Sequence, residues 1–76
     1  MSKLPAGVTG EQLYAAFLRA GWRLIRIRGS HAILGHPTDD NRRVLIARHR
    51  TPVPVGTLAT IRRESGYTVA ELRRLL

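Results

Sequence analysis

Gly29, Ser30 and His31 form the tripeptide with the clearest chemical potential in this chain. The tripeptide lies between two stretches that favour strands, 22–28 and 31–35, so Gly29 and Ser30 are expected to form a turn and His31 to begin a strand. A neutral imidazole titrates near physiological pH and can take a proton from one oxygen and return it to another. Cleavage of an RNA strand needs such transfers, so His31 is a candidate acid or base. A surface or capping role is the alternative.

The charge of the chain indicates the partner. The formal charge is +8, and twelve of the thirteen basic residues are arginine. Guanidinium groups suit phosphate oxygens and can stack on bases, so nucleic acid is the expected partner, with an ordinary solvated arginine surface as the alternative. The candidate substrate-binding residues, besides the turn itself, are Arg26, Arg28 and Arg48. The Ser30 hydroxyl, or the backbone amides of Gly29 and Ser30, would donate to a phosphate oxygen.

Length and composition argue against several other kinds of site. A chain of 76 residues supports one small core, so a single domain over residues 1–76 is expected. The chain has no cysteine, and His31, His36 and His49 lack helical ligand spacing, so neither a metal nor a cofactor is expected. Asp39 and Asp40 are interpreted as turn formers. No apolar run approaches the roughly 20 residues that span a bilayer, so we expect no membrane partner and a cytoplasmic protein.

The expected elements alternate with clear turn and cap signals. They are a helix ending at Gly21, strands over 22–28, 31–35 and 43–48, a helix over 57–65, and a last helix that opens at Thr68. Thr9 followed by Gln12, and Thr68 followed by Glu71, resemble capping boxes. The two prolines between Arg48 and Val55 predict an extended connection. The expected core comprises Leu13, Phe17, Trp22, Leu58, Ile61, Leu72 and alternate strand residues, with a bulge or a partner at the first strand.

The motifs resemble, in order along the chain, those of the HicA family of small toxins, messenger-RNA interferases of bacterial and archaeal toxin–antitoxin pairs. The matching segments are Ala20-Gly21-Trp22, Gly29-Ser30-His31, His36-Pro37, Arg48-His49, Val55-Gly56-Thr57-Leu58 and Ser65-Gly66-Tyr67-Thr68. The resemblance spans roughly residues 9–75. It implies an α+β fold similar to the double-stranded-RNA-binding domain, α-β-β-β-α with a three-stranded antiparallel sheet, to which this chain adds a short C-terminal helix. It also implies His31 as the catalytic residue and a HicB-type antitoxin protein as partner.

The resulting hypothesis is a metal-independent endoribonuclease that cleaves mRNA, reaching operator DNA only indirectly through the antitoxin complex. Whether His31 acts as base or acid stays open. The chain lacks the proline that many relatives carry shortly before the histidine of the third strand, so His49 stays open between a second acid or base, a phosphate contact and a loop residue. Two other classes of protein remain: a non-catalytic RNA-binding module of double-stranded-RNA-binding-domain type, and a DNA-binding regulator whose recognition helix comprises residues 58–66.

Overall fold

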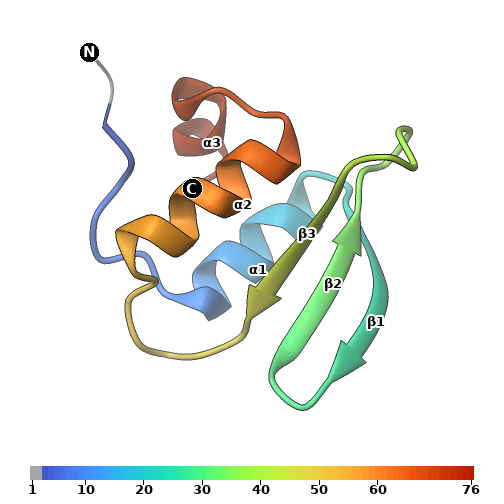
Figure 1. Cartoon of the computed structure of the whole chain (residues 1–76), viewed down its shortest axis with the longest axis horizontal. Helices are drawn as coiled ribbons and strands as arrows, with labels where there is room; N and C mark the ends of the chain where they lie inside the picture. The colour runs from blue at the N-terminus through green and yellow to red at the C-terminus, as the bar shows by residue number, and fades with distance from the viewer. Residues whose placement is uncertain (1–2) are drawn as a thin grey trace.

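A computed structural model describes residues 3–76; Met1 and Ser2, which open the expected domain, lie outside the described residues. The elements are α1 (Gly10–Arg19), β1 (Arg23–Arg28), β2 (His31–Gly35), β3 (Arg43–Ala47), α2 (Val55–Ser65) and α3 (Val69–Leu75). Figure 1 shows the helices gathered on one side of the sheet, with β1 at its far edge. The predicted α+β fold, α-β-β-β-α with a short extra C-terminal helix, is confirmed.

Two helices begin with the capping boxes expected from the sequence. The Thr9 hydroxyl accepts the Gln12 N–H at 3.1 Å, and the Gln12 side chain accepts the Thr9 N–H at 3.0 Å. Thr68 and Glu71 repeat the arrangement at the start of α3. Each pair satisfies backbone donors that a helix start leaves without partners.

The remaining element bounds differ slightly from the prediction. Helix α2 begins at Val55 and not at Thr57, and Pro54 is its N-cap. The helix can begin directly after this proline because a residue at that position donates no hydrogen bond within the helix. Strand β1 begins after Trp22, whose N–H donates to the Phe17 carbonyl at 3.0 Å and so belongs to the end of α1. These shifts leave the order of the elements unchanged.

The sheet is an antiparallel meander with strand order β1-β2-β3. Alternate residues of β2 and β3 are buried against the helices: Ala32, Leu34, Val44 and Ile46. The pairing of β1 with β2 shifts between Leu24 and Arg26, which confirms the predicted bulge. All six residues of β1 are exposed, since α1 and α2 pack on β3 and leave this edge uncovered.

The core forms where the helices meet the covered face of the sheet. Its buried members are Leu13, Phe17, Trp22, Leu34, Val44, Ile46, Leu58, Ile61 and Leu72, and they include every core residue that the sequence predicts by name. Trp22 is 2% exposed, and its indole N–H donates to the Tyr67 hydroxyl at 2.8 Å. The hydrogen bond satisfies the polar atom of a buried ring and ties the start of β1 to the chain before α3.

The segment between β3 and α2 forms no helix, as its prolines predict, but it is only partly extended: it bends at Arg50 and Thr51 and returns to the start of α1. The Val53 N–H donates to the Val8 carbonyl at 2.7 Å, and Thr9 pairs with Pro52 in an isolated bridge. This pairing holds the end of β3 against the first turn of α1. Residues separated by about 40 positions in the sequence therefore meet beside the β1–β2 turn.

Polar side chains hold the turn between β2 and β3 through hydrogen bonds. The Nδ1 atom of His36 accepts the N–H groups of Thr38 at 3.2 Å and Asp39 at 3.1 Å. Asp39 in turn accepts the Asn41 N–H at 3.0 Å. Within residues 3–76, no group of three or more His, Asp or Glu side chains is arranged to hold a metal ion. No helix in the same range is long and apolar enough to cross a membrane.

Candidate functional site

His31 is the first residue of β2 and is exposed at the tip of the hairpin with β1. It lies opposite Arg28 in one neighbouring strand and Ala47 in the other. Gly29 has φ +58°, a left-handed conformation that side-chain-bearing residues rarely adopt, so glycine allows the two-residue turn. The rigid sheet therefore fixes the backbone that carries the imidazole, as predicted.

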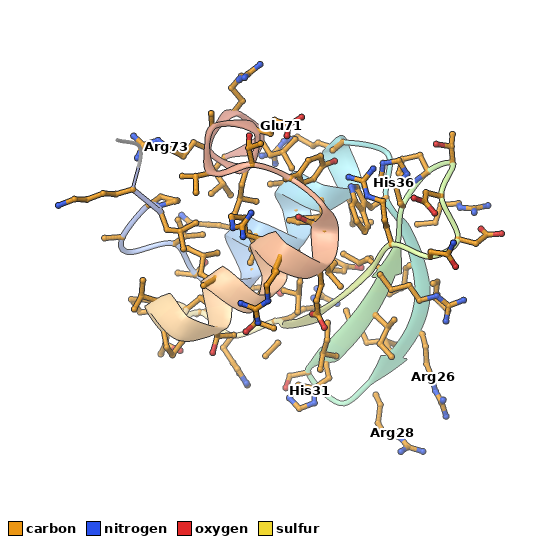
Figure 2. The ribbon with its side chains drawn as sticks, turned by 45° about the horizontal axis from the view of Figure 1, so that its top comes forward. Arg26, Arg28, His31, His36, Glu71 and Arg73 are labelled. Carbon is orange, nitrogen blue, oxygen red and sulfur yellow. The ribbon has the colours of Figure 1, made fainter. Side chains whose placement is uncertain are left out.

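The uncovered face of the sheet places two predicted arginines beside His31. Arg26, Arg28 and His31 line a shallow hollow together with Ile33 and Leu45. Figure 2 shows Arg26, Arg28 and His31 at the same end of the molecule, away from Glu71 and Arg73. The described residues that line this hollow are two arginines, one histidine and two apolar residues, so the local electrostatic potential favours an anion.

The other predicted site residues line a separate hollow on the α1 side of the same turn. Gly29, Ser30 and Arg48 meet Glu11 and Arg50 there. Ser30 belongs to the turn and His31 begins β2, and the two neighbours line different hollows. The predicted site is therefore divided between two hollows that share the β1–β2 turn.

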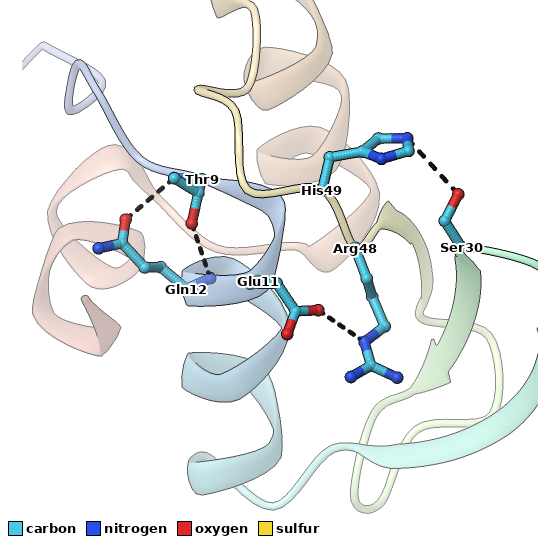
Figure 3. Close-up of polar contacts among 6 residues, drawn as sticks. All are labelled: Thr9, Glu11, Gln12, Ser30, Arg48 and His49. Carbon is cyan, nitrogen blue, oxygen red and sulfur yellow. Dashed lines mark hydrogen bonds and ion pairs between the residues drawn. The ribbon is translucent and has the colours of Figure 1, made fainter.

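Arg48 is held by contacts that the sequence analysis did not foresee. Its Nε donates to the Glu11 carboxylate at 2.8 Å, as Figure 3 shows. Its guanidinium lies 4.2 Å from the centre of the Tyr14 ring. The hydrogen bond to Glu11 raises the pKa of Arg48 above its ordinary value. Glu11 takes only Nε, and the other two guanidinium nitrogens remain chemically able to donate to phosphate.

His49 is the further residue that the structure brings to this turn. Its Nε2 lies 3.5 Å from the Ser30 hydroxyl oxygen, and Figure 3 shows the two side chains directed toward each other. Its carbonyl accepts the Glu11 N–H at 3.1 Å. The sequence analysis left the role of His49 open, because only the return of the chain to α1 places it here.

Comparison with known proteins identifies the family. The family model described as "HicA toxin of bacterial toxin-antitoxin" matches residues 10–67 of this chain. The chain belongs to the HicA toxin family. A comparison with curated proteins finds no match.

The HicA match covers both hollows. It extends from the first residue of α1 to Tyr67, so it includes the β1–β2 turn and the end of β3, while α3 lies beyond it. HicA toxins act in toxin–antitoxin systems, and the membership implies a HicB-type antitoxin as the partner of this chain. The family predicted from the motifs is thus confirmed, and the assignment of individual site residues remains a prediction.

Helix α2 of this HicA chain offers limited support for DNA reading. The Arg62 guanidinium donates to the Tyr67 carbonyl at 3.0 Å, and the buried Ser65 hydroxyl donates to the Arg62 carbonyl at 2.7 Å. Arg62 therefore closes the C-terminal end of the helix. Of the two arginines in residues 58–66, Arg62 is half-buried and only Arg63 is exposed.

Proposed function

We propose that this HicA toxin is a metal-independent endoribonuclease that cleaves mRNA with His31 as a catalytic residue. The observation that carries the proposal is the exposed imidazole of His31 in one hollow with Arg26 and Arg28. RNA supplies its own nucleophile, the 2′-hydroxyl, so the protein needs to move protons and to stabilise charge on the phosphate.

Each site residue has a role in this mechanism. His31 transfers a proton to or from a reacting oxygen. Arg26 and Arg28 neutralise charge that accumulates on the phosphate, and Arg48 holds the strand from the α1 side of the turn. The Ser30 hydroxyl and the backbone amides of Gly29 and Ser30 belong to the turn that lines the hollow beside Arg48, where they would donate to a phosphate oxygen. A cellular mRNA substrate implies action in the cytoplasm.

We propose that the HicB-type antitoxin silences the toxin by covering the uncovered face of the sheet. This face combines arginines with exposed apolar side chains: Ile25 is 48% and Leu45 is 50% exposed. An acidic partner would pair its carboxylates with Arg26 and Arg28 while burying the apolar side chains between them. Contact with operator DNA would then arise only through the antitoxin complex.

The decisive experiment compares cleavage of a labelled mRNA fragment by the wild-type chain and by His31→Ala. Loss of one acid or base group is expected to slow cleavage by about 10²- to 10⁴-fold, with the thermal unfolding curve unchanged because His31 is exposed. His36→Asn is the matched control, because it removes an imidazole but keeps an acceptor for the turn, and it should cleave as the wild type does.

The same assay separates the alternatives. Cleavage should persist in excess chelator, whereas loss that Mg²⁺ restores would contradict a metal-independent mechanism. RNA binding without cleavage by the wild-type chain would favour the non-catalytic RNA-binding module of double-stranded-RNA-binding-domain type. Equal cleavage by His31→Ala and the wild type would remove His31 from the mechanism.

A further inference from the structure

The environment of His49 shows a histidine whose backbone is fixed from three sides. The Glu11 N–H donates to its carbonyl at 3.1 Å, and its own N–H donates to the Ala47 carbonyl at 2.9 Å. The preceding Arg48 N–H donates to the Ser30 carbonyl at 2.7 Å, which extends the pairing of β2 with β3 beyond the strand ends. These bonds fix the backbone from which the exposed His49 imidazole extends toward Ser30.

The start of α1 is pressed against this segment. A β-carbon at Gly10 would lie 2.9 Å from the His49 nitrogen, closer than real β-carbons approach other atoms. Only glycine allows α1 to begin here, so the helix start, the end of β3 and the β1–β2 turn form one packed unit. The position of the His49 backbone is therefore a consequence of the whole fold.

The two histidines line different hollows. His31 lines the hollow on the uncovered face of the sheet, and His49 lines a third hollow together with Gly10 and Pro52. The Nε2 atom of His49 also lies 3.5 Å from the hydroxyl oxygen of Ser30, which lines the hollow beside Glu11 and Arg48. An in-line displacement at phosphorus puts the attacking and leaving oxygens on opposite sides of the phosphorus. An acid and a base that serve one phosphate therefore need to approach it from two sides, and His31 and His49 extend from the ends of two different strands beside the same turn.

We propose that His49 is the second proton-transfer group of the site, so that His31 and His49 form an acid–base pair around one RNA phosphate. The proposal rests on the proposed endoribonuclease function. In this step the 2′-oxygen forms a bond to phosphorus while the bond between phosphorus and the 5′-oxygen breaks. One imidazole takes the 2′-hydroxyl proton and the other, protonated, gives its proton to the departing 5′-oxygen. The products are a 2′,3′-cyclic phosphate and a 5′-hydroxyl end, and no metal, water or redox partner is consumed.

The test uses an RNA oligonucleotide that spans a mapped cleavage position, made with either oxygen or sulfur at the bridging 5′ position. A thiolate leaves without a proton, so the sulfur substrate no longer needs the acid. On the oxygen substrate, His31→Ala and His49→Ala should each be slower than the wild type by about 10²-fold or more. On the sulfur substrate, only one of these two variants should recover to near the wild-type rate, which identifies the acid.

His36→Asn is again the control for loss of an imidazole, and circular dichroism checks that each variant is folded. A His49→Ala chain that cleaves the oxygen substrate at the wild-type rate would overturn the proposal. Equal losses of both variants on both substrates would also overturn it, since His49 would then act through the fold or through its charge. The cleavage rate of the wild-type chain tests the proposed endoribonuclease function separately. A wild-type chain that cleaves neither substrate refutes that function, and this proposal with it.

Discussion

The Glu11 carboxylate from α1 lies 2.8 Å from the Nε atom of Arg48 at the end of β3. The contact places a negative charge in the hollow where the sequence predicts only phosphate-binding groups. Arg48 is therefore oriented before RNA arrives, and part of its charge is already compensated.

Removing the Glu11 charge should strengthen RNA binding. In a His31→Ala background, which prevents cleavage, Glu11→Gln should tighten the dissociation constant several-fold and steepen its salt dependence, by about 0.7 in the log–log slope for each further phosphate neutralised on a single strand. Fluorescence anisotropy of a labelled RNA over a salt series measures both. Glu64→Gln, on the exposed surface of α2, is the control of equal net charge. An equal gain in the control would mean that overall charge decides affinity.

Reversing the charge of Arg26 and Arg28 should weaken binding of both RNA and antitoxin. Each substitution puts a carboxylate into the hollow that contains His31. Arg73→Glu is the matched control, because Arg73 lies at the opposite end of the molecule (Figure 2) and its Nη1 donates to the Lys3 carbonyl at 2.7 Å. Calorimetric titration with the antitoxin measures the change in its affinity.

Expression of the chain without antitoxin should arrest growth only when RNA cleavage is intact. An inhibited complex in which His31 stays accessible would exclude inhibition by occlusion.

Truncating Leu72 should show how firmly α3 is docked. Leu72 is fully buried in the core, and Leu→Ala at such positions costs about 2–5 kcal/mol of unfolding free energy. Leu76→Ala removes the same atoms from a side chain that is 40% exposed, so it should cost much less. Urea unfolding followed by tryptophan fluorescence measures the unfolding free energy of both variants, since Trp22 is hydrogen-bonded to Tyr67 just before α3. Equal costs would mean that α3 contributes little to the cooperative unit.

The capping box of α3 should make stability depend on pH in the acid range. Hydrogen bonds from Thr68 lower the pKa of Glu71 below its ordinary value. A lowered pKa means that the folded state favours the carboxylate, so this contribution is present above the ordinary carboxyl range near pH 4 and is lost as pH falls through the folded-state pKa. Glu71→Gln keeps the acceptor without the charge, so its unfolding free energy should fall less on acidification. Parallel curves for the two proteins would contradict this role of Glu71.

The sequence predicts local features of this fold well and distant pairings poorly. The two capping boxes depend on residues three apart, and burial of Leu13 and Phe17 follows from helical spacing. The contacts of Glu11 with Arg48 and of Ser30 with His49 join segments 37 and 19 positions apart. No local pattern specifies them, because they depend on how the chain after β3 returns to α1.

One feature of the predicted site is nevertheless implicit in strand geometry. Side chains alternate along β2, so burial of Ala32 and Leu34 against the helices places His31 on the uncovered face of the sheet. The catalytic role of His31 and the binding roles of Gly29, Ser30, Arg26, Arg28 and Arg48 remain predictions for the experiments above.

The uncovered strand β1 also governs how copies of the free protein behave toward each other. An exposed edge that carries Leu24, Ile25 and Ile27 invites pairing with an identical edge. The arginines between them oppose it, because like charges meet when two such strands approach. This protection is electrostatic and shrinks as the screening length falls from about 8 Å at physiological salt to about 3 Å at 1 M. A rise in ionic strength should therefore favour pairing of the unpartnered chain with copies of itself through β1.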